Sequence, residues 1–256
     1  MPLVVRCVSW PVEQLTSLLE RADVVVCTST LQASDAELAA ARATLSAAEQ
    51  ERGGAIANGV VARRFVIGRA LLRAALADAL GELPEMIDIR TGVHGKPYLG
   101  VAEPAMRLWF SVAHTDDLFI CALSRRGEVG VDVERVREMP NWRRVAERVL
   151  HHDALHPVRG TVRDCPSFLG AWCRVEAQLK ANGTGIVGLD AHRTGRLDET
   201  MKVADVRDLV LPTVLAEGRY CAAVALRASP PSNRQAIAPT IDMSAPTRSP
   251  ASASTP

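Results

Sequence analysis

Strict alternation of apolar and acidic side chains over residues 129–134 constrains this chain more than any other feature. The segment reads Val129-Gly-Val-Asp-Val-Glu134. Neighbouring side chains of a β-strand point to opposite faces, so the three valines share one face and the two carboxylates share the other. The pattern therefore predicts a strand with Asp132 and Glu134 about 7 Å apart. Carboxylates so placed repel each other and suit a magnesium ion between them, while a solvated acidic face is the alternative interpretation.

A second line of polar residues occurs some forty residues later, in the segment 172–180. Pro166 and Ser167 predict a helix start with Ser167 as the N-cap. Glu176 and Lys180 are four residues apart, so they lie on neighbouring turns of one helix face. They are interpreted either as an ordinary surface ion pair or as a metal ligand or base beside a phosphate-binding ammonium. Large apolar side chains recur at helical spacing and predict a buried stripe: Phe168, Trp172, Val175 and Leu179.

Periodicity and capping residues predict the remaining elements. Strands are expected at 3–8, 23–28, 87–90, 108–112, 119–123, 201–211 and 219–226. Helices are expected at 31–52 with a second start at Ser46, at 58–81, at 141–150 and at 167–182. The two long helices, each followed by strands, indicate either an internal duplication or a chance similarity of amphipathic helices. Residues 1–124 and 125–228 are therefore the two expected halves, and the Pro/Ser/Ala-rich residues 229–256 are expected to be a disordered tail.

Composition and charge narrow the functional classes. The formal net charge of +1 over 256 residues gives no reason to expect a nucleic-acid partner or a membrane surface. The N-terminus lacks a secretory signal pattern, and no apolar stretch approaches the roughly 18 residues of a membrane span. Six cysteines without Cys-x-x-Cys spacing argue against a disulfide framework or a structural zinc site and predict a cytoplasmic protein. His152 and His156 could hold a metal at their spacing of four, but a solvated helix end is the favoured interpretation.

Three further basic groups are candidates for binding an anion. His114 follows Phe110-Ser-Val-Ala at a strand end, where its imidazole could donate to a phosphate oxygen or have a structural role. Lys96 lies in a Gly-Lys-Pro turn and is either solvated or ligand-binding. Arginines on the long helix 58–81 are expected to decorate its surface: Arg63, Arg64, Arg69 and Arg73.

Taken in order, these segments resemble the 4'-phosphopantetheinyl transferases of the Sfp-like type, which activate carrier proteins of polyketide and non-ribosomal peptide synthases. The matching segments are Arg64–Arg73, Gly95–Leu99, Phe110–Asp116, Gly130–Glu134 and Trp172–Lys180. The resemblance covers roughly residues 45–226. It implies an α/β (α+β) fold, built as a pseudo-dimer of two similar α/β halves with coenzyme A in the cleft between them.

The resemblance also implies roles for individual residues. Three acids are the implied magnesium ligands: Asp132, Glu134 and Glu176. Five basic side chains are the implied contacts to the phosphates and nucleotide of coenzyme A: Arg64, Arg69, Lys96, His114 and Lys180. The implied reaction is attack by a serine hydroxyl of an acyl or peptidyl carrier protein on the pyrophosphate of coenzyme A. Glu176 would take the proton, directly or through a water, and Lys180 would stabilise charge. The protein is expected to be a monomer.

Two positions depart from the family pattern. Val175 replaces a lysine that adds positive charge at the phosphates, and Ala113 replaces a serine before the histidine. Two hypotheses follow. The chain is an active transferase, or it is a repurposed member of the fold that binds coenzyme A, a carrier protein or another small molecule without transfer, or catalyses different chemistry in the same cleft. The second hypothesis predicts that Val175→Lys raises transferase activity.

Overall fold

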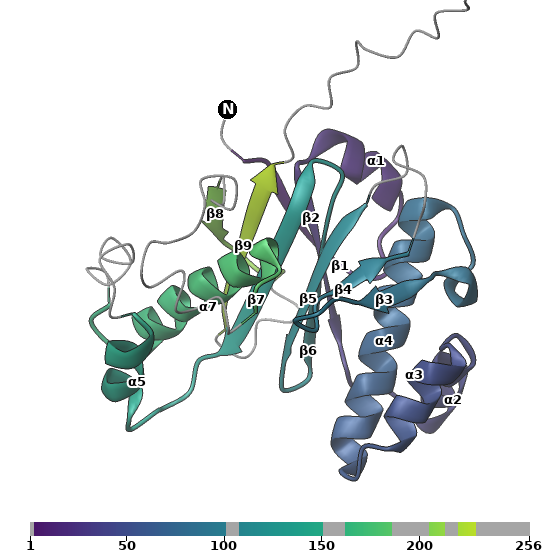
Figure 1. Ribbon diagram of the computed structural model, residues 1–256, viewed down its shortest axis with the longest axis horizontal. Coiled ribbons are helices and arrows are strands. Elements are labelled where there is room, and N and C mark those ends of the chain that lie inside the picture. Colours follow the sequence, from purple (N-terminus) through teal and green to yellow (C-terminus); the bar gives the residue numbers. More distant parts are fainter. Residues whose placement is uncertain (1–2, 101–107, 151–161, 186–204, 213–219, 229–256) are drawn as a thin grey trace, which may run out of the picture.

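The computed structural model describes residues 3–100, 108–150, 162–185, 205–212 and 220–228 (Figure 1). Two β-sheets pack face to face, and helices cover the outer face of each sheet (Figure 1). The predicted α/β class is therefore confirmed. The proposed likeness of the two halves remains a prediction, since their sheets differ in strand order and size.

The first sheet has the strand order β1-β2-β6-β5. β1 (Val5–Ser9) pairs in parallel with β2 (Val24–Thr30). β6 (Leu118–Ser124) pairs antiparallel with β2 and with β5 (Trp109–Thr115). The chain thus passes from β5 to β6 through a turn of only two residues, Asp116 and Asp117, which lies at the same end of the sheet as His114.

The second sheet has the order β7-β9-β8, with antiparallel pairing throughout. β7 (Gly127–Arg135) follows β6 directly, β9 (Tyr220–Ala228) lies in the centre, and β8 (Asp205–Asp208) lies at the edge. A small separate hairpin joins β3 (Ile89–Thr91) to β4 (Pro97–Leu99). The 3-10 turn η1 (Pro84–Met86) precedes it.

The core is arranged around β6, which is buried on both faces. Its residues Phe119, Cys121 and Leu123 pack with the helices of the N-terminal half. The alternate residues Leu118, Ile120 and Ala122 pack against the second sheet, including the three valines of β7. The alternation predicted for residues 129–134 is thus confirmed: Val129, Val131 and Val133 face the core between the sheets. Gly130, Asp132 and Glu134 consequently face away from it.

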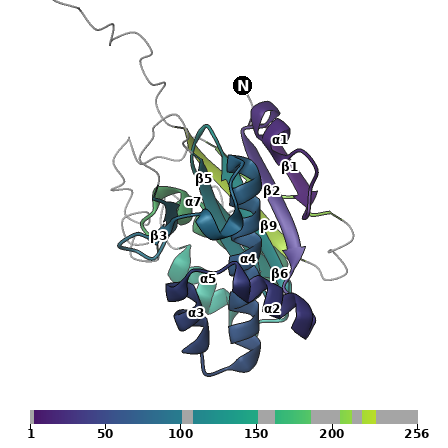
Figure 2. The same cartoon turned by 90° about the vertical axis from the view of Figure 1, so that its right-hand side faces the viewer.

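The long helix α4 (Gly59–Leu80) runs along the outer face of the first sheet (Figure 2). The side chain of Asn58 accepts a hydrogen bond from the amide of Val61 at its start, and Gly81 ends it with φ of 73°. α1 (Leu15–Arg21), α2 (Asp35–Ala43) and α3 (Ala47–Gly54) complete this layer. The expected helix over 31–52 is therefore two helices, each beginning at a capping box, at Ser34 and at Ser46.

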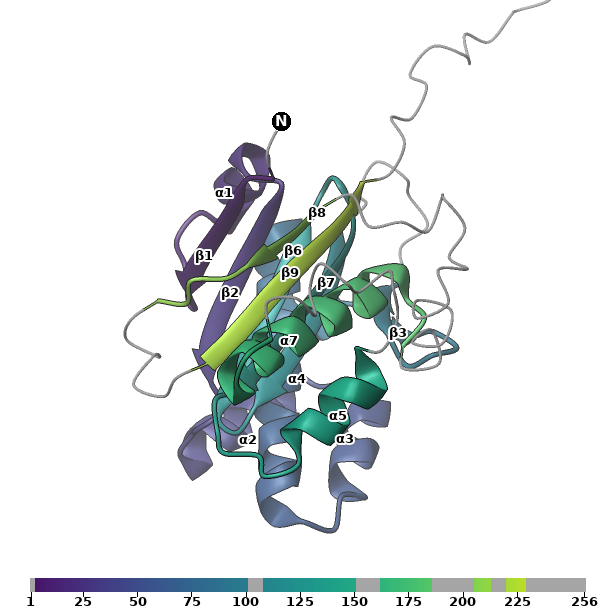
Figure 3. The same cartoon turned by 90° about the vertical axis from the view of Figure 1, so that its left-hand side faces the viewer.

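The helix α7 (Cys165–Asn182) covers the second sheet, and α5 (Trp142–Val149) packs against it (Figure 3). The predicted N-cap Ser167 is wrong, because Asp164 caps the helix and Ser167 completes the capping box from its third position. α7 approaches β7 very closely at Gly130. A Cβ atom there would overlap the backbone carbonyl of Ala177, so only glycine allows this distance.

Within the described residues, no helix is long and apolar enough to cross a membrane. Some predictions fall outside the described part of the chain: residues 201–204 of the expected strand, the pair His152 and His156, and the tail 229–256.

Candidate functional site

The predicted strand and helix meet. Lys180 of α7 donates from Nζ to Asp132 Oδ1 of β7 at 2.8 Å and to the carbonyl of Val131 at 3.1 Å. Asp132 is only 8% exposed, so this carboxylate is largely removed from water. Its Oδ2 is buried and has no hydrogen-bond partner by geometry among the described residues, although the Cys173 thiol lies close enough to this carboxylate for Asp132 to raise the thiol pKa. A buried carboxylate oxygen without a partner is costly, and it marks a place where a cation or a donor would bind.

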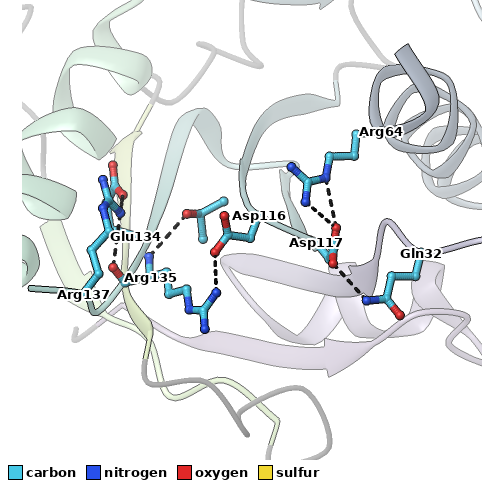
Figure 4. A network of polar contacts seen from close by, with 8 residues as sticks. Gln32, Arg64, Asp116, Asp117, Glu134, Arg135 and Arg137 are labelled. Carbon is cyan, nitrogen blue, oxygen red and sulfur yellow. Dashed lines mark hydrogen bonds and ion pairs between the residues drawn. The ribbon is translucent and has the colours of Figure 1, made fainter. Parts of the chain in front are cut away.

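We call three carboxylates and the lysine beside them the acidic centre: Asp132, Glu134, Glu176 and Lys180. Glu134 forms an ion pair with Arg137 at 3.2 Å (Figure 4). Partial burial raises the pKa of Glu176, and the charges of Asp132 and Glu134 raise it further against the opposing effect of Lys180. The three carboxylates are therefore close enough to repel one another.

The acidic centre fits a divalent cation in its chemistry, although it is not preassembled around one. Among the described residues, no three His, Cys, Asp or Glu side chains are arranged as a metal-binding group. Instead Lys180 and Arg137 are the ion-pair partners of Asp132 and Glu134. The unpartnered Oδ2 of Asp132 and the raised pKa of Glu176 are both features that a bound magnesium would relieve.

A cavity of about 650 Å³ lies at the His114 end of β5, against α4. We call it the cationic cavity, because four basic side chains line it against one acidic one, Asp116: Arg52, Arg64, Arg69 and His114. Apolar side chains form much of the remaining lining, among them Phe65 and Phe119. The guanidinium groups of Arg52 and Arg69 lie 5.4 and 5.9 Å from the ring centre of Phe65, within cation–π range. Such a cavity suits an anion joined to a flat or apolar group.

Arg64 is held by the turn between β5 and β6. Its Nε and Nη2 both donate to Asp117 Oδ1, at 2.9 and 2.7 Å (Figure 4). Gln32 donates to the other carboxylate oxygen at 2.9 Å. These two partners lower the pKa of Asp117, with the Gln32 hydrogen bond first. The neighbouring Asp116 points the other way and pairs with Arg135 of β7 at 2.9 Å (Figure 4).

Arg69 and Arg73 share the carboxylate of Glu49, at 3.5 and 2.7 Å. Arg73 was expected on the helix surface, but it is 2% exposed and also donates to the carbonyls of Pro84 and Ile87. Its role is therefore structural. Arg69 lines the cationic cavity, and burial lowers its pKa.

His114 lies between the cationic cavity and the acidic centre. Its imidazole is accessible, yet the surrounding atoms lower its pKa by desolvation, and the charges of Lys180 and Arg64 lower it further. Those two cations belong to α7 and α4, so His114 is within electrostatic range of one basic side chain from each half of the chain.

Lys96 lies apart from the other candidates. Its Nζ pairs with Glu128 Oε2 at 2.5 Å and donates to the carbonyl of Val129 at 3.2 Å, near the start of β7. It lines a separate cavity of about 250 Å³ with Asn182 and Gly183. Burial lowers the pKa of Lys96 against the effect of Glu128. Its predicted contact with coenzyme A therefore remains a prediction.

The two residues predicted to depart from the family pattern do not line the cationic cavity. Val175 is 1% exposed and belongs to an apolar cluster between α7 and α5. Ala113 is buried in the core between the two sheets. A further cavity of about 450 Å³, lined by residues of α5 such as Trp142 and Arg143, touches none of the predicted site residues.

Sequence reasoning missed several participants. Asp117, Arg52 and Phe65 were not among the predicted site residues. The long-range partners Glu128 and Gln32 carry no local signal. One sequence signal was available, the capping box at Ser46. Its second member, Glu49, is the carboxylate that pairs with Arg69 and Arg73.

Comparison with known proteins gives a consistent result. Residues 128–222 match the family model of the 4'-phosphopantetheinyl transferase superfamily. Residues 29–126 match the model described as 4'-phosphopantetheinyl transferase, N-terminal. The two matches meet between β6 and β7, so the cationic cavity and the acidic centre fall largely in different matched regions.

Individual relatives agree with these matches. The chain is 33% identical over 161 residues to the 4'-phosphopantetheinyl transferase AcpT of Salmonella typhi, covering 61% of this chain and 79% of the relative. It is 37% identical over 126 residues to AcpT of Escherichia coli, covering 47% and 57%. It is 31% identical over 150 residues to the 4'-phosphopantetheinyl transferase HetI of a Nostoc species, covering 58% and 63%.

Proposed function

Because the chain belongs to the 4'-phosphopantetheinyl transferase superfamily, a family of transferase enzymes, we propose that it moves the phosphopantetheine arm of coenzyme A to a carrier protein. The acceptor is a serine of an acyl or peptidyl carrier protein. The observation that supports this proposal most is the cationic cavity, because its lining residue His114 is close enough to Lys180 of the acidic centre for that charge to lower the His114 pKa. A pyrophosphate there would have cations on one side and an acid that can accept a proton on the other.

Coenzyme A binding is supported by the charge and shape of the cationic cavity. Its phosphates would be met by Arg64, Arg69 and His114, and its nucleotide by the apolar lining. Guanidinium groups bind phosphate through two parallel N–H donors, which favours arginine at such a site. The lowered pKa of His114 keeps its imidazole neutral until an anion arrives, and a neutral imidazole can still donate one hydrogen bond.

Magnesium is part of this proposal. Asp132, Glu134 and Glu176 would hold the ion, which would supply positive charge to the pyrophosphate as the bond to the leaving group breaks. The partnerless oxygen of Asp132 supports this assignment. Lys180 would remain close to the phosphates as a second source of positive charge, since its ammonium already lies on Asp132.

The proposed transfer has simple atom balance. The hydroxyl oxygen of the carrier serine bonds to the phosphorus next to the pantetheine arm, and the bond from that phosphorus to the oxygen of 3',5'-ADP breaks. Glu176 accepts the hydroxyl proton, directly or through a water. Without a metal, partial burial raises the pKa of Glu176. A magnesium ion on the same carboxylate would lower that pKa, so we assign the proton to Glu176 from its place in the acidic centre and not from its basicity.

We also propose the Sfp-like type, with carriers of secondary-metabolite synthases, and a cytoplasmic monomer with halves 1–124 and 125–228. The free thiols of the cysteines support the reducing compartment. The repurposed alternative had two supports, Val175 and Ala113. Both side chains lie in the core, so neither makes the cationic cavity more apolar, while the positive charge missing at Val175 still supports this alternative.

The test is transfer itself. The purified protein is incubated with coenzyme A, magnesium and each of several apo carrier proteins, and intact-mass spectrometry follows the carrier. We expect addition of one phosphopantetheine arm to at least one carrier, and none without coenzyme A. A folded protein that binds coenzyme A by calorimetry but modifies no carrier would contradict the transferase and support the repurposed alternative.

A further inference from the structure

Resting on the proposed function, we propose that Asp117 is a positioning residue for coenzyme A binding. It does not line the cationic cavity, whereas Arg64 does. Asp117 acts through Arg64, by fixing the direction of its guanidinium before the substrate arrives (Figure 4).

Asp117 is itself firmly placed. Its carbonyl accepts from the amide of Leu31 at 2.6 Å, and its carboxylate accepts from the side chain of Gln32 at 2.9 Å. Both partners follow β2, while Asp117 belongs to the turn after β5 and Arg64 to α4. Contacts from the end of β2 and from α4 therefore hold the main chain and the carboxylate of Asp117 in place.

The contact leaves Arg64 free to bind a ligand. Of the five N–H groups of a guanidinium, the Nε–H and one on Nη2 point to Asp117 Oδ1. In the described part of the chain, no acceptor contacts the other three. Arg64 therefore presents Nη1 and the rest of Nη2 at the cavity wall, which is the edge that could meet a phosphate.

Asp117 could affect anion binding in two opposite ways, and the sign of the effect separates them. Its negative charge partly offsets that of Arg64, so removing it would strengthen anion binding if charge dominated. Its hydrogen bonds hold a long, flexible side chain still, so removing them would weaken binding if order dominated. Ordering one such side chain on binding corresponds to about a three- to tenfold change in affinity. An exposed pair contributes less through charge, so we infer that order dominates.

The experiment is titration calorimetry of coenzyme A into the full chain and five variants. Asp117→Ala should weaken binding about three- to tenfold. Asp117→Asn keeps the acceptor for Arg64, and the exposed amide of Gln32 can turn to suit it, so affinity should stay within about twofold of the unmodified protein. Gln32→Ala loosens the same carboxylate without changing the cavity lining and should weaken binding by about twofold. Arg64→Ala combined with Asp117→Ala should bind no more weakly than Arg64→Ala alone.

A matched control lies one residue along the same helix. Arg63 pairs with Asp35 at 2.6 Å, and neither residue lines the cavity, so Asp35→Ala should leave binding unchanged. In transfer assays, Asp117→Ala should raise KM for coenzyme A with kcat nearly constant.

Two results would overturn the positioning role: unchanged or tighter binding by Asp117→Ala, or equal weakening by Asp117→Ala and Asp117→Asn. Thermal unfolding checks that each variant is folded, and Gln32→Ala carries the test if Asp117→Ala is not. Failure of the proposed function would look different, because the unmodified protein would then modify no carrier, whether or not it bound coenzyme A.

Discussion

The cationic cavity and the acidic centre differ in where their counter-charges lie. Arg64 and Arg69 pair with Asp117 and Glu49, and neither carboxylate lines the cavity. Asp116, which does line it, pairs with Arg135 of β7. In the acidic centre the partners Lys180 and Arg137 sit directly on Asp132 and Glu134. An anion can therefore enter the cavity without breaking an ion pair, whereas a metal must displace or rearrange cations already present. The first region is organised for its ligand in advance, and the second is not.

The largest expected effect concerns the acidic centre. Asp132→Asn removes one charge while keeping the shape of the side chain and an acceptor for Lys180. We expect the rate of phosphopantetheine transfer to fall about 100-fold or more, because charge stabilisation at a transferring phosphoryl group supplies several kcal/mol. The rate is measured by carrier-protein mass gain under saturating coenzyme A.

Asp208→Asn is the matched control for this variant. Asp208 pairs with Arg174 on an exposed part of α7, so its loss should change the rate by less than about twofold. An Asp132→Asn protein with nearly unchanged transfer would mean that the acidic centre does not carry the chemistry.

The second-largest expected effect is a loss of stability when a positive charge is added to α7. Val175→Lys would restore the lysine of the family pattern, but Val175 is buried in the apolar cluster with Phe168 and Leu179. We expect the free energy of unfolding to fall by about 3 kcal/mol, from lost apolar burial and a desolvated ammonium. Urea denaturation measures it, with Val145→Lys on α5 as the exposed control, since Val145 is 37% exposed.

Unchanged stability with faster transfer would reverse this interpretation. It would show that the lysine reaches the phosphates from the buried position, and that the missing cation limits the enzyme as the repurposed hypothesis requires.

The smallest effect is a shift in the titration of His114, which links the two regions. We expect an NMR titration to give a pKa below the ordinary value of 6.5, because desolvation and the charges of Lys180 and Arg64 disfavour the imidazolium. Lys180→Met should raise this pKa, and so should bound coenzyme A, whose phosphates favour the protonated ring. A pKa that does not respond to Lys180→Met would mean that the two regions are not electrostatically coupled.

The sign of the pH dependence follows from the same shift. With the folded-state pKa below that of the unfolded chain, the unfolded chain binds more protons in the interval between the two values. The contribution of His114 therefore makes the protein less stable as the pH falls from 6.5 through the folded-state pKa, and His114→Gln should flatten the stability curve in that interval.

Sequence patterns with a fixed period predicted the local structure well. The two-residue alternation of 129–134 assigned both faces of β7 correctly, because a strand allows only one assignment once a face is buried. The helix 58–81 was confirmed to within one residue at each end, since Asn58 and Gly81 are strong end signals. The misplaced N-cap at Ser167 shows the limit of such signals, because Asp164 and Ser167 belong to one capping box and only the structure shows which end each occupies.

The candidate site was predictable only in part. The meeting of Asp132 with Lys180 followed from the resemblance and not from spacing, because 48 residues separate them. Arg73 looked like Arg64 and Arg69 in sequence, yet its acceptors include backbone carbonyls beyond the helix that only the folded chain brings to it. Lys96 likewise pairs with a residue 32 positions away. Ion pairs between distant segments produce no periodic pattern in a sequence. The sequence alone therefore could not decide which of these residues belong to the site.

The close approach of α7 to β7 at Gly130 has a consequence for how this enzyme could diverge. The Lys180 ammonium reaches β7 because the main chains of α7 and β7 touch at Gly130, a residue that has no side chain. Even the methyl group of an alanine at position 130 would push α7 away from β7. The polar side chains of α7 would then move away from Asp132 and Glu134. The reactive side chains can therefore be substituted one at a time during evolution, whereas position 130 has to remain glycine.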